Sequence, residues 1–503
     1  MSGVVVPKQA VDGIRDGRAD AVVLIEPVDG AKNEQGPEPW QRLSTEIEAV
    51  AGSEERGCWS WVPREELSVP IGSNKLEKWS AACIYQVPTR IRDHSRGSYT
   101  PQLVSLGPFH HGEDHLLPME EHKRRVLLHC LRRRGAKPLA DFIEAMNGAA
   151  DELESMYCDL PVEWSGEQNR GRFVETMIID GYFMLEVIRM ATGGLELCDY
   201  DANDPIFGVH AHVNTIPYVR RDMLLIENQL PLLALEKIVA VEGSKKLEAV
   251  KGGGLAINAM VLKFLSPSTQ CPENLEGRLR LHPLDVFRYS RIQIQGGEEP
   301  FSTTGLPNVE DTPMLTPTGD ISAMALHDAG VQLRMVSSKS VRSVRCAGRV
   351  LSLPILSVNE LTEPIFLNLI AFERLHVRLT SFPVTGYVFF MSNVVKSVED
   401  VSLLESKSII RNALGNSQKV VQLFESLNAD LHVYPKDSPL LEVHQRMETH
   451  CQAAWSMWRA YVARKYFRSP WAPISLAGST FFLLMTVARN IYGLTQRRMM
   501  DEG

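Results

Sequence analysis

The sequence predicts a mainly α-helical protein with a small antiparallel β element, in which a large helical body is followed by one C-terminal transmembrane helix. Three observations lead to this prediction. Apolar residues recur every three or four positions over much of the chain, which is the period of an α-helix. One interval instead alternates with period two, which is typical of strands. The last uncharged stretch is long enough to cross a bilayer.

Composition excludes several classes of protein. The 503 residues carry 53 Lys and Arg against 61 Asp and Glu, which gives a formal net charge of −8. This balance argues against nucleic-acid binding, where neutralisation of phosphates is the main sequence-independent contribution. The eight cysteines are far apart and form no C-x-x-C pair, a spacing unlike that of zinc sites and redox pairs.

Residues 1–78 are predicted to form an acidic, mostly disordered, coil-rich extension. Gly, Pro and Ser interrupt this segment, and it has little apolar periodicity with which to offset the chain entropy lost on folding. It also lacks the long apolar run behind a basic start that marks a secretory signal.

The helical body is predicted to span residues 79–468. Its clearest helix covers residues 171–190, where an apolar stripe repeats at helical spacing and Gly193 marks the end. Pro231 is expected to kink or restart the helical run around it. Further helices are expected at 247–265, 365–379, 384–398, 417–427 and 439–467.

Two intervals of the body depart from the helical pattern. Residues 331–358 contain the alternating stretch SVRSVRCAGRVLSL, which predicts a short β-hairpin. Residues 295–319 are dense in Gly, Pro, Ser and Thr, which predicts a disordered loop within the body.

A transmembrane helix is predicted at 469–494, with a short tail at 495–503. The 18 residues from Trp471 to Ala488 contain no charged side chain and would span ~27 Å of a hydrocarbon core that is ~30 Å thick. The alternative is a buried core helix, because serine, glycine and threonine dilute the hydrophobicity of the stretch. The residues expected to anchor the chain are Trp471, Leu476, Phe481, Phe482, Leu483, Leu484 and Tyr492.

The flanks of this stretch suggest how the chain would be oriented. Basic residues before it, among them Arg464 and Lys465, slightly outnumber those after it, so the positive-inside bias favours a cytosolic body. No Asn-x-Ser/Thr sequon occurs, which agrees with that orientation. The expected location is therefore the plasma membrane or an endomembrane, with a single span.

Several long blocks of the sequence resemble the plant family called domain of unknown function 247. The resemblance covers about residues 79–494 and implies a largely helical plant protein that is held on a membrane. No catalytic residue is established for that family, so none is carried over. The blocks follow in the order of the family and are IYQVPTRIRDHSRGSYTPQLVSLGPFHHG (84–112), MEEHKRRVLLHCLRR (119–133), FVETMIIDGYFMLEVI (173–188), DMLLIENQLPLLALEKI (222–238) and parts of 368–410.

Two groups of polar residues are candidates for chemistry. His110 and His111 lie among possible metal ligands, but Gly112 favours a loop over a helical ligand pair, so we expect them to pack against the next helix. Asp180 and Glu227 interrupt apolar runs, where a buried hydrogen-bond network is the alternative to an acid/base pair. No nucleophile elbow, H-E-x-x-H or P-loop accompanies them. The expectation is no catalytic residue, no metal site and no cofactor.

The expected function is that of a membrane-anchored, non-enzymatic interaction or recognition protein. Its expected partners are the lipid bilayer and a protein of unknown identity, without nucleic acid. Resemblance to grass members of the family implies one alternative, a pollen-side specificity component of self-incompatibility. The other alternative is a metal- or carboxylate-dependent hydrolase, which requires His110, His111, Asp180 or Glu227 to converge within ~5 Å of a shared cavity.

Overall fold

The computed structural model describes most of the helical body and the C-terminal stretch. The extension predicted at 1–78 and the loop predicted at 295–319 lie outside the described residues. Those residues are 81–193, 200–243, 253–293, 321–431, 438–452 and 471–501, apart from positions 94, 134, 202, 209, 270, 273, 274, 276, 277, 377, 378, 380 and 430.

Residues 81–293, called the N-terminal part, are helical. The helices are α3 (Thr89–Arg92), α4 (Leu117–Arg132), α5 (Leu139–Asn147), α6 (Ala150–Ser155), α7 (Arg170–Gly193), α8 (Ala211–Asn214), α9 (Ile216–Asp222), α10 (Leu232–Glu242), α12 (Gly253–Leu265) and α13 (Pro283–Ile292), with 3₁₀ turns η1 (Arg96–Ser98), η2 (Asp114–Leu116) and η3 (Val162–Trp164).

Residues 321–452, called the C-terminal part, combine helices with short strands. The helices are α14 (Ala323–Asp328), α15 (Thr362–Leu375), α16 (Pro383–Val394), α17 (Val398–Ser406), α18 (Ser417–Asn428) and α19 (Pro439–Gln452), with the 3₁₀ turn η6 (Val341–Ser343). The strands are β1 (Gln332–Val336), β2 (Arg345–Ala347), β3 (Val350–Pro354), β4 (Leu356–Val358) and β5 (Ile410–Asn412). The prediction of a mainly helical body with a small β element is confirmed.

Helix α7 is the centre of the N-terminal part. It packs against α4, α5, α10 and α12, and residues 176–188 are buried without interruption. This differs from the single apolar stripe that the sequence indicated. A helix that is surrounded by others has no solvent-facing side, so its polar residues must find partners inside the core.

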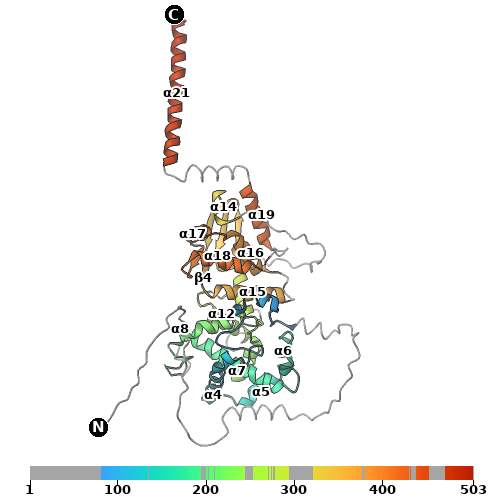
Figure 1. The fold of residues 1–503 in the computed structure, drawn as a ribbon. Helices are drawn as coiled ribbons and strands as arrows, with labels where there is room; N and C mark the ends of the chain where they lie inside the picture. The colour runs from blue at the N-terminus through green and yellow to red at the C-terminus, as the bar shows by residue number, and fades with distance from the viewer. Residues whose placement is uncertain are drawn as a thin grey trace, which may run out of the picture.

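Helix α16 is the corresponding centre of the C-terminal part. It packs against α15, α18 and α19, and also against α13 from the N-terminal part. Figure 1 shows α14 and α16–α19 grouped above α15 and α12, with α4–α7 below them. The two parts therefore meet in a layer that contains α13, α15 and the ends of their neighbours.

The strands form two small sheets with mixed pairing. β2 and β3 are antiparallel, as a hairpin at 331–358 predicts, but β1 pairs with β3 in parallel. β4 pairs in parallel with β5, which lies far along the chain. The purely antiparallel element that was expected is therefore only one edge of a three-stranded mixed sheet.

Some helix bounds differ from the prediction for identifiable reasons. Residues 223–231 are not helical, and Pro231 is the residue that precedes α10. The helix expected at 384–398 corresponds to α16 and ends earlier, at Val394, and a separate helix, α17, begins at Val398. Ser397 starts α17 with a capping box, in which its hydroxyl accepts from the Asp400 amide and the Asp400 carboxylate accepts from the Ser397 amide.

The predicted transmembrane helix is wrong. The stretch does form α21 (Trp471–Asp501), a helix of 31 residues, which stands apart from both parts in Figure 1. However, no helix among the described residues is both long and apolar enough to cross a membrane. The physical reason is dilution of the apolar run by Ser475, Gly478, Ser479, Thr480 and Thr486. The expectation of a single membrane span is corrected by the same finding.

Part of the predicted anchor can be located on α21. Its described anchor side chains are all exposed along the helix, and they are Phe481, Phe482, Leu483 and Leu484. The side chains of Trp471, Leu476 and Tyr492 lie outside those that the structure describes.

Candidate functional site

Asp180 lies in a buried polar cluster between α4 and α7. Its carboxylate accepts from Lys123 Nζ at 2.5 Å and from the Gly107 amide at 2.8 Å. Lys123 Nζ also lies 2.6 Å from Glu120 Oε1, which accepts from the Ser105 hydroxyl at 2.6 Å. Burial raises the pKa of Asp180 to about 6, while the ammonium group of Lys123 opposes that rise. The carboxylate in the middle of α7 is thus paired with a cation.

His111 adjoins the same cluster. Its Nδ1 lies 3.7 Å from Glu120 Oε2, and its ring meets the Trp164 ring edge-on, with 5.2 Å between centroids. Burial lowers the pKa of His111 to about 4, although Glu120 opposes this. The imidazole is therefore neutral at physiological pH and contributes packing rather than charge.

Glu227 is the centre of a second buried cluster. Its carboxylate accepts from Arg92 Nη2 and from the Val87 amide, each at 2.5 Å. His110 Nε2 lies 3.3 Å from Glu227 Oε2, and His110 Nδ1 lies 2.7 Å from Glu113 Oε1. Burial lowers the pKa of His110, but the two carboxylates outweigh this effect and raise it above its usual value.

The residues of the hydrolase alternative therefore fall into two clusters rather than one. His110 joins Glu227, whereas His111 connects with Asp180 only through Glu120 and Lys123. None of these residues lines the large cavity described below. Within the described parts of the chain, no group of three His, Cys, Asp or Glu side chains could hold a metal ion.

The polar run 227–229 joins separate segments, as expected for a buried hydrogen-bond network. Asn228 Oδ1 accepts from the Leu106 amide at 2.7 Å, and Gln229 Oε1 accepts from the Leu284 amide at 3.0 Å. These bonds satisfy backbone donors that would otherwise be buried without a partner. The role of the run is to fasten segment 104–107 and the start of α13.

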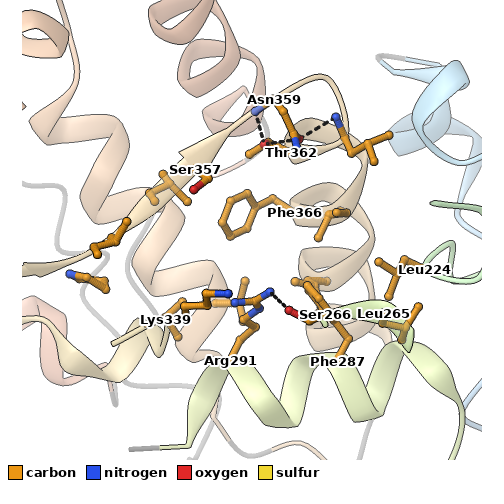
Figure 2. Close-up of a pocket in the computed structure, with 18 of the residues that line it drawn as sticks. Leu224, Leu265, Ser266, Phe287, Arg291, Lys339, Ser357, Asn359, Thr362 and Phe366 are labelled. Carbon is orange, nitrogen blue, oxygen red and sulfur yellow. Dashed lines mark hydrogen bonds between the residues drawn. The ribbon is translucent and has the colours of Figure 1, made fainter. Parts of the chain in front are cut away.

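A cavity of about 600 Å³ lies where the two parts meet. It is bounded by α9, α12 and α13 of the N-terminal part, and by α15, α16, β4, β5 and segment 337–341 of the C-terminal part. In Figure 2, Phe366 reaches into it from α15, with Arg291 and Lys339 on one side and Asn359 opposite. A cavity of this size is typical of sites for small organic molecules.

The walls of the cavity are mainly apolar, and their charge has one sign. Among the described residues that line it there is no Asp, Glu, His or Cys. The apolar walls include Leu224, Leu265, Phe287, Phe366, Leu369 and Tyr387, and the basic residues are Arg220, Arg221, Arg291, Lys339 and Arg411.

Only one of these cations has a carboxylate partner among the described residues. Arg221 Nη1 donates to Asp222 Oδ1 at 2.7 Å, and both side chains are buried. The guanidinium of Arg291 instead donates to the Ser266 hydroxyl at 3.2 Å and lies 4.5 Å from the centre of the Phe287 ring. Burial lowers the pKa of Arg291 to about 10, so the group keeps its charge at neutral pH. This excess of positive charge makes the cavity suited to an anion.

Sequence reasoning missed this cavity because its lining comes from segments scattered between residues 220 and 411. The signals it followed were polar residues within apolar runs, and these turned out to belong to the two buried clusters. The basic residues of the cavity show no distinctive spacing in the sequence, and a solvated surface is the usual interpretation of such side chains.

Comparisons with known proteins identify relatives in plants. A family model described as a plant protein of unknown function, DUF247, matches residues 84–485. The chain is 26% identical over 442 residues to UPF0481 protein At3g47200 of Arabidopsis thaliana, covering 82% of this chain and 86% of that protein. It is 18% identical over 522 residues to Putative UPF0481 protein At3g02645 of the same plant, covering 87% and 94%. No solved structure matches the chain.

The Asp180 cluster predicts a strong effect at Gly107. This residue has φ +72°, and an added Cβ would lie 2.6 Å from Tyr157 Oη and 2.8 Å from the Gln229 carbonyl oxygen. Gly107→Ala should lower the free energy of unfolding by about 1–2 kcal/mol through backbone strain, and by about 1–3 kcal/mol more through the clash. Urea unfolding of purified protein measures this loss.

Gly112→Ala is the matched control for that change. Gly112 has φ +87°, but no atom lies within 4 Å of an added Cβ. The free energy of unfolding of this variant should therefore fall only by the contribution from backbone strain at positive φ. Equal losses in the two variants would show that the close approach at Gly107 has no energetic weight.

His282 predicts a dependence of stability on pH. The residue caps α13, since its Nδ1 accepts from the Asp285 amide at 3.3 Å while its Nε2 donates to the Cys83 carbonyl oxygen at 3.1 Å. Burial lowers the pKa of His282 to about 4. Between pH 6.5 and pH 4 the unfolded chain therefore binds a proton that the folded chain excludes. Stability should fall over this window as the pH falls, by up to about 3 kcal/mol from this side chain.

The variant His282→Asn keeps a cap acceptor but removes the titrating ring. Its free energy of unfolding should fall less between pH 6.5 and pH 4 than that of the unaltered chain. The exposed His327, changed to Asn, is the control and should leave the pH profile unaltered. A profile for His282→Asn that matches the unaltered chain would contradict this account.

Proposed function

The chain belongs to the plant protein family of unknown function DUF247, as its sequence blocks predicted, and from this premise we propose that it is a recognition protein that binds an anionic small molecule. The binding site is the cavity between the two parts. The observation that carries the proposal is the combination of apolar walls with basic side chains and no carboxylate among the described lining residues. Such walls favour a ligand with an apolar body and a negative group.

The proposed site binds its ligand without catalysing a reaction. General acid/base work most often uses His, Asp or Glu within hydrogen-bond reach of the ligand, and the described lining contains none of these. Of the other side chains that can do such work, it holds Lys339 and Tyr387. The carboxyl and imidazole groups of the two buried clusters, such as those of Asp180 and His110, are engaged in structural hydrogen bonds away from the cavity. A protein partner that responds to the bound ligand completes the proposed recognition role.

A dye pair that differs by one sulfonate group tests this proposal. Anilinonaphthalenesulfonate carries a negative group, and phenylnaphthylamine is its neutral counterpart. The full chain should bind the anionic dye more tightly, as measured by fluorescence titration. Phe366→Asp should weaken this binding by at least about tenfold, since it places a carboxylate in the cavity, and one lost or repulsive charged contact amounts to about 1.5–3 kcal/mol.

Phe366→Leu is the matched control, because it keeps an apolar side chain at the same place. It should retain binding of the anionic dye within a few-fold. Binding at the exposed apolar residues of α21 is common to all variants, so it cancels in the comparison. Equal binding by Phe366→Asp and Phe366→Leu would exclude the cavity as the anion site.

The cavity also predicts an unusual pattern of stability on α13. Arg288 and Arg291 lie three positions apart, but Arg288 Nε donates to the buried Glu373 carboxylate at 2.9 Å. Arg288→Met should therefore lower the free energy of unfolding by about 3–5 kcal/mol, because it leaves a buried charge without its partner. Arg291→Met should change it by about 1 kcal/mol or less, since no carboxylate depends on it. Thermal or urea unfolding of the two variants checks this contrast.

A further inference from the structure

We infer that the side of the cavity formed by Arg291 and Lys339 is a subsite for a dianionic phosphate monoester. This inference rests on the proposed function, and it identifies the negative group of the ligand. The two cations come from different parts of the fold, Arg291 from α13 and Lys339 from the segment after β1. Figure 2 shows both directed toward the same side of the cavity.

The two positive charges lie close enough to influence each other. Lys339 is an exposed residue, but partial burial of its ammonium group and the nearby charge of Arg291 lower its pKa. Neither side chain has a carboxylate partner among the described residues. Two adjacent cations without a counter-charge repel each other, so this arrangement reduces stability unless a bound anion neutralises it.

Two arginines close to the subsite are paired with carboxylates. Arg288, one turn before Arg291, is paired with Glu373, and Arg221, which also lines the cavity, is paired with Asp222. Both of these pairs are buried. Arg291 and Lys339 have no such partner among the described residues, and neither do Arg220 and Arg411, so the unbalanced positive charge extends along the cavity wall.

Hydroxyl groups complete the subsite. Arg291 Nη2 donates to Ser266 Oγ at 3.2 Å, and Lys339 Nζ donates to Ser268 Oγ at 2.5 Å. Ser266 Oγ also lies 2.6 Å from Thr269 Oγ1. A guanidinium, an ammonium and several hydroxyls offer the hydrogen-bond donors that the oxygens of a phosphate group accept.

The donors are held in place before any ligand arrives. The ring of Phe287 supports the guanidinium of Arg291 at 4.5 Å. The segment that carries Lys339 is folded by its serines, since the Ser340 amide donates to Ser338 Oγ at 3.0 Å and Ser343 Oγ donates to it at 2.7 Å. Preorganised donors lose little freedom on binding, which favours affinity.

Charge and accessibility together indicate the class of ligand. A phosphate monoester carries a charge of about −1.5 to −2 at pH 7, which matches two cations, whereas a carboxylate or sulfonate carries only −1. Lys339, Ser337 and Ser268 are exposed, so the phosphate side faces the opening of the cavity. Phe366 and Tyr387 are then available to an apolar or aromatic body attached to the phosphate.

Three probes with the same ring system test the subsite at constant pH: naphthyl phosphate, naphthalenesulfonate and naphthol. Calorimetry on the full chain should rank them in that order, with the phosphate bound at least about tenfold more tightly than naphthol. Arg291→Met and Lys339→Met should each weaken phosphate binding by about tenfold or more. Both variants should leave naphthol binding unchanged, which also shows that the cavity is still folded.

Arg349→Met is the matched control. Arg349 belongs to the C-terminal part, as Lys339 does, and it is exposed but does not line the cavity, so the variant removes a positive charge from outside the site. It should bind all three probes as the unaltered chain does. Naphthyl phosphate bound no more tightly than naphthol would overturn the subsite, as would a loss in Arg349→Met as large as that in Arg291→Met.

The outcomes also separate this inference from the proposed function. If the anionic dye binds in a Phe366-dependent way while the phosphate has no advantage, the subsite is wrong and the recognition function stands. If neither probe binds in the cavity, both are wrong. Displacement of naphthyl phosphate by vesicles with phosphatidic acid would assign the phosphate to a lipid headgroup. Lack of displacement would assign it to a soluble ester.

Discussion

The structure depends on side-chain oxygens that bind the backbone of one extended segment, residues 102–107. This segment forms no sheet, so its buried amides have no strand partner. The Asp222 carboxylate accepts from the amides of Gln102, Leu103 and Val104, Asn228 accepts from that of Leu106, and Asp180 from that of Gly107. Since unpaired buried amides destabilise a fold strongly, these acceptors determine where the segment can lie.

The buried charge that these bonds require is balanced locally. Lys123 lies beside Asp180, and Arg221 lies beside Asp222, each within 2.7 Å. Removing one member of such a pair leaves an isolated charge in the core, which is far more unfavourable than the pair itself. The polar residues that interrupt apolar runs are thus explained by the hydrogen bonds that they supply to buried backbone amides.

Buried side chains that hydrogen-bond to the backbone also connect the two parts of the fold, and in this way they shape the cavity. Asn368 on α15 accepts from the Ile226 amide at 2.8 Å and donates to the Ser98 carbonyl oxygen at 2.7 Å. Glu373, one turn and a half further on, accepts from Arg288 and from the Thr385 amide. These two residues fix α15 against α13 and α16. Helix α15 carries Phe366, and α13 carries Phe287 and Arg291, so these contacts position the walls of the cavity.

Helical periodicity and breaker residues predicted much of this fold, because both are local properties. The bounds of α7, α15 and α18 lie close to the expected ones, and β1 to β4 fall within 331–358, whereas β5 at Ile410–Asn412 was not expected. A local pattern could not predict how the strands pair. The alternation in 331–358 does not determine whether β1 runs parallel or antiparallel to β3, and β5 lies far along the chain from its partner β4. The prediction of a transmembrane helix was wrong because apolar length alone was weighed above the serines and threonines of α21.

The candidate site shows why a binding residue is harder to predict than a structural one. Arg288 and Arg291 have the same chemistry and share one helix, and nothing in the neighbouring sequence separates them. Their difference lies in Glu373, which approaches only Arg288 after the chain has folded. A cation becomes a binding group when the fold brings it to a cavity and supplies no carboxylate. Sequence patterns show where charges occur, but only the packed structure shows which of them are left for a ligand.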